Sequence, residues 1–321
     1  MDPSRRQFLR KLGGASLGLA ASGVVAGLAR AQTHASVAPA LQLTDLGGGL
    51  GVITGTGGNV VVRSAPEGLL LVDSGAPDGA AALVRLLAER FAGAPVSVLF
   101  NTHWHLDNTG GNDALAADGR ALTIVAHENT RLWMSTEFDV EWEEKHYERR
   151  EPKARPNKTF YTSDRQPLAI EFGGTEVSYG HLLEAHTDGD IYVRFPDRNV
   201  IVAGGAVTAA RYPVLDFSTG GWIGGMVDAT NKLLAMADAE TLIVPEAGRV
   251  QRRSDLEAQV KMLSTVRERI EAIALQGRGV EDMIAEKITK EFDERYGAES
   301  AKFISMAYEG MWWSRLRGIV A

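Results

Sequence analysis

The apolar positions in the first hundred residues predict short strands separated by glycine-rich turns. Residues 51–53, 59–63 and 68–72 are apolar runs of strand length. Residues 80–91 instead carry leucines three and four positions apart, which is the spacing of one helix face. Residues 95–100 are almost continuously apolar, and this predicts a buried strand. A further strand is expected at 121–126 and a helix after Gly110.

The second half of the chain repeats this succession of elements. Residues 128–165 separate the two halves; they are rich in aromatic and charged residues and predict one helix followed by a long excursion. From 255 onward the pattern is helical, with breaks at Gly277 and Gly297. The remaining predicted elements are strands at 168–172, 176–179, 191–195, 199–203 and 241–244 and a helix at 225–236. Two such sets favour an α/β fold in which two mixed sheets pack face to face with helices outside, an αββα sandwich.

The N-terminal segment has the pattern of an export signal. Arg5 and Arg6 begin a basic stretch, residues 12–28 are apolar and small, and Ala29-Arg30-Ala31 is a cleavage motif. The adjacent arginines indicate the twin-arginine type; a membrane-anchoring helix is the alternative, although the run is short and glycine-rich for one.

An export signal divides the chain into three parts and predicts a location. We expect a signal peptide at 1–31, a domain at 32–254 whose first residues to 46 are an irregular lead-in, and a helical extension at 255–321 packed on the same domain. The location would be the periplasm, reached through the twin-arginine machinery, without stable membrane insertion of the mature protein.

Charge and cysteine content exclude several kinds of partner and site. The formal net charge is −7, and loss of the basic leader makes the remainder more acidic. An acidic surface argues against binding to nucleic acid, so we expect a small-molecule substrate. The chain has no cysteine, which excludes disulfides and thiolate metal ligands.

Three of the seven histidines have the spacing of a metal site. His103 and His105 follow the predicted strand 95–100, and alternate residues of an extended segment point the same way. His186 precedes another predicted strand. Three imidazoles and a water form the common catalytic zinc arrangement. The alternative is that all three are ordinary polar loop residues.

Other polar residues near these motifs receive weaker interpretations. Asp107 continues the face of His103 and His105 and is the candidate catalytic residue, as an orienting group or general base. His127 is interpreted as structural or as a support for a metal ligand. The sequence indicates no metal role for His34, His146 and His181. Asp73, Asp188 and Asp190 are interpreted as structural, the last two as caps of a turn or as partners of a histidine ring.

The stretch 101–112, Asn-Thr-His-Trp-His-Leu-Asp-Asn-Thr-Gly-Gly-Asn, resembles the metal-binding motif of the metallo-β-lactamase superfamily. Supporting similarities lie at 59–62, 72–75, 186–190, 212–216 and 220–221. The resemblance implies the αββα sandwich, with the metal site at one edge between the two sheets.

Three positions depart from the pattern that the resemblance implies. Asn108 stands where a histidine is expected, Gly205 where a bridging aspartate is expected, and Ala247 where a final histidine is expected. The second metal site would then keep only Asp107, with Glu246 as an open possibility. We therefore expect one zinc ion per chain, bound by His103, His105 and His186.

The function that follows is a periplasmic zinc hydrolase. A zinc-bound hydroxide, assisted by Asp107, suits an activated acyl substrate such as a lactone, thioester or β-lactam. Aromatic residues of the 128–165 excursion, with Trp104, would either wall an apolar substrate pocket or form core beneath a loop. The alternative function is a non-catalytic protein that binds a ligand or partner and retains a vestigial metal site.

Overall fold

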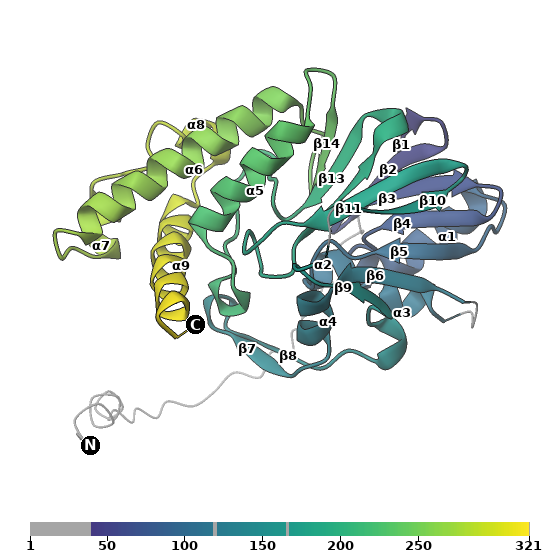
Figure 1. Cartoon of the computed structure of the whole chain (residues 1–321), viewed down its shortest axis with the longest axis horizontal. Coiled ribbons are helices and arrows are strands. Elements are labelled where there is room, and N and C mark those ends of the chain that lie inside the picture. Colours follow the sequence, from purple (N-terminus) through teal and green to yellow (C-terminus); the bar gives the residue numbers. More distant parts are fainter. Residues whose placement is uncertain (1–39, 118–120, 165–166, 321) are drawn as a thin grey trace, which may run out of the picture. The chain divides into compact units, whose positions relative to one another are not determined.

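The first sheet has seven strands in the order β1-β2-β3-β4-β5-β6-β9 (Figure 1). The computed structural model describes residues 40–117, 121–164 and 167–320. The strands from β1 to β4 pair antiparallel, and those from β4 to β9 pair parallel. The bounds are β1 (Gln42–Gly47), β2 (Leu50–Thr56), β3 (Gly58–Ala65), β4 (Gly68–Val72), β5 (Val96–Phe100), β6 (Thr123–His127) and β9 (Lys158–Phe160). Helix α1 (Ala80–Arg90) joins β4 to its parallel neighbour β5.

The second sheet has five strands in the order of the chain, β10 to β14. Only its last pair is parallel, and helix α5 (Ile223–Met236) makes that crossover. The bounds are β10 (Leu168–Phe172), β11 (Thr175–His181), β12 (Ile191–Phe195), β13 (Val200–Gly204) and β14 (Leu242–Pro245).

Alternation along β3 shows how one strand serves two cores. Val61 faces inward and belongs to the cluster between the sheets, together with side chains of β12 and β13. Val60 and Val62 face outward and pack with Leu83 and Leu87 of α1. Successive strand residues point to opposite faces, so a run of buried valines requires cover on both sides of the sheet.

A third apolar layer covers the outer face of the second sheet. Helix α6 buries Leu256, Leu263 and Ile270 there, and α9 adds Phe303. The helices after α5 are α6 (Arg253–Ala274), α7 (Val280–Ala285), α8 (Asp293–Tyr296) and α9 (Ser300–Val320), shown in green and yellow in Figure 1. The predicted αββα layering is therefore confirmed, and the chain from Ala38 onward is one compact unit.

Two sequence interpretations were wrong in detail. The lead-in is not irregular throughout, because β1 pairs with β2 over Gln42–Gly47; its largely exposed position at the sheet edge leaves no alternating apolar pattern to recognise. The excursion after α4 (Glu128–Met134) contains a hairpin, β7 (Phe138–Val140) and β8 (Lys145–Tyr147), and its last part forms β9 of the first sheet. Three-residue strands are too short to show a period.

The remaining α-helices of the described residues are two short ones that follow His105. They are α2 (Leu106–Thr109) and α3 (Asn112–Leu115). The predicted signal at 1–31 lies outside the described residues. In the part of the chain that is described, no helix is both long and apolar enough to cross a membrane.

Candidate metal centre

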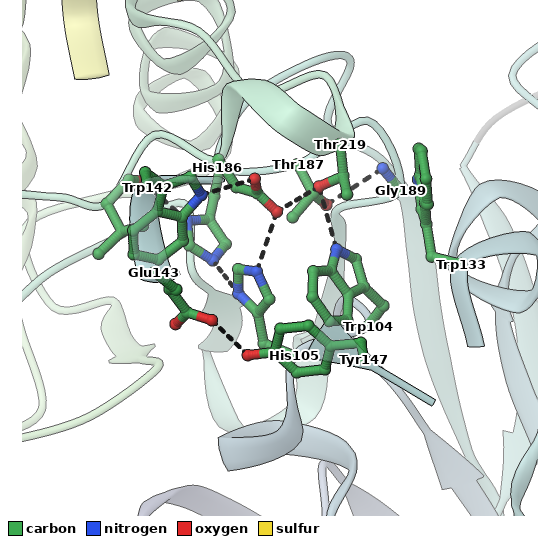
Figure 2. A network of polar contacts seen from close by, with 12 residues as sticks. Trp104, His105, Trp133, Trp142, Glu143, Tyr147, His186, Thr187, Gly189 and Thr219 are labelled. Atoms are coloured by element: carbon green, nitrogen blue, oxygen red, sulfur yellow. Dashed lines mark hydrogen bonds and ion pairs between the residues drawn. The ribbon is translucent and has the colours of Figure 1, made fainter. Parts of the chain in front are cut away.

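The three predicted ligands come from two loops at one edge of the sandwich. His103 and His105 lie between β5 and α2, and His186 lies in the loop between β11 and β12. The Ile191 N–H donates to the Thr102 carbonyl at 2.8 Å, which ties the two loops together. Strand ends from both sheets therefore converge, and His105 and His186, 81 positions apart in the chain, become neighbours (Figure 2).

One ring nitrogen of each histidine points toward a common centre. These ligand atoms of His103, His105 and His186 all lie within 4.8 Å of one another. The rings are nearly perpendicular in pairs, with centroids 4.6 to 4.9 Å apart. All three side chains are buried.

The outward nitrogen of each ring has a fixed partner. His103 Nδ1 lies 3.0 Å from Thr102 Oγ1, whose hydrogen is donated to Asp73, so the ring must be the donor. His105 Nε2 donates to Asp216 Oδ2 at 3.1 Å. His186 Nδ1 donates to the Val214 carbonyl at 2.8 Å. Such bonds fix the tautomer and leave a lone pair on the opposite nitrogen for a metal.

The inward nitrogens fit a metal better than they fit one another. His103 Nε2 is buried and has no hydrogen-bond partner among the described residues. His105 Nδ1 and His186 Nε2 are 2.8 Å apart, although the tautomers just derived make both of them acceptors. An unpaired buried nitrogen and two facing lone pairs are unfavourable. A cation bound by all three nitrogens removes both costs.

Burial favours the neutral form of two of these rings. Burial, and then the neighbouring histidines, hold the pKa of His103 well below its usual value. Burial and His105 lower the pKa of His186 to about 4. At His105 burial acts in the same direction, but the Asp216 carboxylate outweighs it and raises the pKa. Metal binding requires neutral imidazole, so His103 and His186 are already in the competent state.

Asp216 is the functional residue that sequence reasoning missed. It accepts from His105 Nε2 through Oδ2 and from Trp142 Nε1 through Oδ1, the latter at 2.9 Å (Figure 2). Thr219 Oγ1 also donates to it at 2.5 Å, and Thr219 in turn accepts from Trp104 Nε1. The only sequence signal was its place in the 212–216 segment of the family resemblance.

The candidate catalytic residue, Asp107, lies in a chain of charged groups. Its carboxyl group lines the same cavity as Glu246, and Glu246 forms an ion pair with Arg211. Burial and the Glu246 charge raise the pKa of Asp107. Glu246, left open by the sequence, therefore acts on Asp107 through its charge.

The positions expected to form a second metal site are used differently here. Asn108 Nδ2 donates to Asp73 Oδ2 at 2.9 Å, so its amide is committed to that carboxylate. Asp73 also accepts two hydrogen bonds from Thr102, and burial raises its pKa to about 7. A Cβ atom at Gly205 would lie 2.2 Å from the His186 ring, so the ring occupies that space.

The remaining candidates have structural contacts. Asp190 accepts from the backbone N–H and the hydroxyl of Thr187 and so closes the turn that follows His186. Asp188 accepts from Trp133 Nε1 at 2.8 Å. His127 accepts from the Asn129 N–H at the start of α4 and stacks on His181, with ring centroids 3.9 Å apart. His146 is exposed and pairs with Asp139, while His34 lies outside the described residues.

Two cavities adjoin the histidine cluster. The first, of about 400 Å³, is lined by His105, His186, Asp107, Glu246 and other polar side chains. The second, of about 260 Å³, has four aromatic side chains, Trp104, Trp133, Phe138 and Tyr147, in its lining and is called the aromatic cavity below. Leu106, Lys145 and Tyr147 line both, so the two are neighbours. The aromatic cavity is bounded by Trp104, Trp133, Met134, Phe138 and Tyr147 together with polar residues of 145–150.

Comparison with known proteins assigns the family. The model of the metallo-β-lactamase superfamily matches residues 53–257, which is most of the described chain. The chain belongs to this superfamily. The region matched contains the three histidines, Asp107, Asp216 and Glu246, but not α7 to α9.

Solved structures support the fold. A metallo-β-lactamase from Pontibacter korlensis is 21% identical, with a TM-score of 0.55, over 70% of this chain and 99% of that one. The stereoselective inverting sec-alkylsulfatase Pisa1 from Pseudomonas sp. is 16% identical, with a TM-score of 0.64, over 87% of this chain and 52% of that one. The DIM-1 metallo-β-lactamase gives 15% identity and a TM-score of 0.55 over 71% of this chain and 98% of that one. A match over 87% of the chain has to extend into the C-terminal helices, beyond residue 257, where the family model ends.

Proposed function

We propose that this protein is an exported zinc-dependent hydrolase that binds one ion through His103 Nε2, His105 Nδ1 and His186 Nε2. The observation that carries the proposal is the convergence of three ring nitrogens within 4.8 Å, each made available by a fixed partner on the other side of its ring. In a catalytic zinc site the protein supplies three ligands and water takes the fourth position, whereas in a structural site the protein supplies all four ligands. Zinc held in this way lowers the pKa of water and polarises a substrate carbonyl.

The charged residues of the first cavity supply proton handling. Asp107 lines the same cavity as His105 and His186, and its carboxyl group is the one placed to take a proton from an attacking water. Glu246 lines the same cavity, and its charge helps to raise the pKa of Asp107. Arg211, paired with Glu246, keeps that carboxyl group in position.

The substrate we propose is an activated acyl compound with an apolar portion. One metal, rather than two, suits lactones, thioesters and β-lactams better than phosphodiesters, which depend on two ions that clamp the attacking and leaving oxygens. The aromatic cavity beside the histidines would hold the apolar portion, because half of its lining residues are Trp, Phe, Tyr or Met. A secondary alkyl sulfate is included in the substrate panel, because the chain aligns over 87% of its length with an alkylsulfatase.

The first test is metal analysis of the protein purified from the periplasm, followed by hydrolysis assays. We expect about one zinc per chain. Turnover of at least one of a lactone, a thioester, a β-lactam and a secondary alkyl sulfate is expected, with loss of turnover after chelation. Two tightly held ions would contradict the single site. Tightly bound zinc without turnover of any of these substrates would favour the non-catalytic alternative.

A further inference from the structure

The C-terminal extension reaches the cavity that adjoins the histidine cluster. Glu299 and Lys302, at the start of α9, line it together with His105 and His186. Both residues lie beyond the region matched by the family model. The β7–β8 hairpin contributes Lys145 to the same cavity.

Aromatic rings hold the two lysines at this cavity. The Lys302 ammonium lies 4.8 Å from the centroid of Trp142, and the Lys145 ammonium lies 4.4 Å from that of Tyr147. Trp142 is itself fixed by its hydrogen bond to Asp216. A cation over an aromatic face is attracted to the ring but keeps its hydrogen-bond donors available.

Two carboxylates of the cavity have partners other than a lysine. Glu246 pairs with Arg211, and Glu143 accepts from the Tyr147 hydroxyl. Glu299 is exposed beside Lys302. Among the described residues neither Lys145 nor Lys302 forms an ion pair with a carboxylate, which distinguishes both of them from Arg211.

We propose that Lys302 and Lys145 form an anion-binding subsite and that the natural substrate carries a negatively charged group, a carboxylate or sulfate. The inference deepens the proposed function by narrowing the substrate class to anionic compounds with an apolar part. Lys145 lines both cavities, so one molecule can place its apolar part among the aromatic side chains and its anion between the two ammonium groups. The C-terminal extension then contributes to substrate selection.

The test measures binding to the metal-free protein, so it does not depend on catalysis. The probes are 4-phenylbutyrate and its neutral analogue 4-phenylbutanol, followed by titration calorimetry and by tryptophan fluorescence, since Trp142 lies under Lys302. Chelated protein is used because a carboxylate also binds zinc. We expect the acid to bind several-fold more tightly than the alcohol and its affinity to fall with added salt.

Variants assign the preference to the two lysines. Lys302→Gln and Lys145→Gln should each weaken binding of the acid by about fivefold, the size expected for one exposed ion pair. Binding of the alcohol should not change, and Lys302→Arg should keep the affinity for the acid. Lys153→Gln is the matched control, because Lys153 is exposed and does not line this cavity.

Two results would overturn the inference. One is equal or undetectable binding of acid and alcohol by the wild-type protein; the other is unchanged affinity for the acid in both Lys302→Gln and Lys145→Gln. Failure of the proposed function gives a different result, namely no turnover by the zinc-bound enzyme while metal-free protein still discriminates between the two probes.

Discussion

At the scale of single residues, the histidine ligands are defined as much by their outer partners as by their own positions. Thr102, Asp216 and the Val214 carbonyl each accept a hydrogen bond from one ring N–H. These bonds fix which nitrogen of each ring faces inward without a proton. Asp107 differs, because it is not one of these ring partners and instead lines the cavity together with Glu246. This difference separates metal binding from proton transfer and can be tested by substitution.

We expect Asp107→Asn to lose activity by roughly 10²–10⁴-fold while zinc binding is retained. The amide keeps the shape of the carboxyl group but cannot accept a proton. His186→Ala should lose both zinc and activity, because two imidazoles remain. Hydrolysis rates and zinc content are measured together, with Asp78→Asn, an exposed aspartate, as the control. Full activity of Asp107→Asn would remove Asp107 from the mechanism.

Rebuilding the second metal site is a separate question at residue scale. From the sequence alone, Asn108→His, Gly205→Asp and Ala247→His together would supply the missing ligands. The structure argues against this plan, because any side chain at 205 meets the His186 ring at 2.2 Å. A well-packed interior offers no room for the ring to retreat without moving the ligand.

Gly205→Asp should therefore weaken the first site rather than create a second. The expected result is reduced zinc content measured by elemental analysis, with the remaining ion released faster to a chelator. Gly279→Asp is the control, because a Cβ there meets nothing within 4 Å and the residue precedes α7 as its N-cap. Two bound ions in Gly205→Asp would mean that the His186 loop moves more easily than its contacts indicate.

Ligand positions were predictable from the sequence, whereas their supports were not. The His103 and His105 spacing marks a strand end, and a third histidine before a later strand completes the set. The contact between Asp216 and His105 joins positions 111 residues apart, and no local pattern encodes it. The packing of β10 to β13 was similarly visible in apolar runs, but β1 lies at an exposed edge and β9 is three residues long, so neither carries a period.

At the scale of elements, α4 is joined to the second sheet through a pair of stacked histidines. His127 caps α4 and stacks on His181 of β11, and Thr162 bridges the two rings. His127 is buried, and burial, followed by the neighbouring His181, lowers its pKa to about 3. The His127 ring thus stays neutral in the folded protein at pH values where an unfolded chain would bind a proton.

Stability should depend on pH through His127. An unfolded histidine titrates near pH 6.5, so the contribution of His127 is present above that pH and is lost as pH falls from about 6.5 toward 3. In His127→Asn, which keeps an acceptor for the Asn129 N–H, the loss of unfolding free energy between pH 7 and pH 5 should be smaller by about 2 kcal/mol. Urea denaturation at both pH values measures it.

The exposed His146 provides the comparison for this measurement. Asp139 raises the pKa of His146, so His146→Asn should not reduce the loss of unfolding free energy between pH 7 and pH 5; any change is of the opposite sign and small, because the side chain is half exposed. An identical pH dependence in wild type and His127→Asn would show that the buried ring titrates in the folded protein as it does in the unfolded one.

At the scale of the whole molecule, the site requires the completed fold. Its ligands come from both sheets, Asp216 comes from the segment after β13, and the cavity is finished by α9. An unfolded chain presents none of this arrangement, so metal binding is coupled to folding. Export after folding, which the N-terminal motif predicts, would allow the metal to be acquired before the protein leaves the cytoplasm.

Replacing Arg5 and Arg6 together by Lys should hold the precursor in the cytoplasm, because the arginine pair is the recognised feature of the twin-arginine signal. Cell fractionation followed by mass measurement of the N-terminus reports both location and cleavage near Ala31. Replacing Arg10 and Lys11 by Lys and Arg, which preserves charge, serves as the control. Unchanged export of the Arg5/Arg6 variant would contradict this route.

The residues that line the first cavity come from two different parts of the chain, and this has an evolutionary consequence. Metal ligands come from loops of the shared sandwich, whereas Trp142, Lys145 and Lys302 come from the excursion after α4 and from the terminal helix. Mutations at Lys145 and Lys302 can therefore change which substrate fits without removing a contact to a ligand histidine, whereas Trp142 supports His105 through Asp216. Descendants of this protein would be expected to change their substrate range before they change the type of reaction.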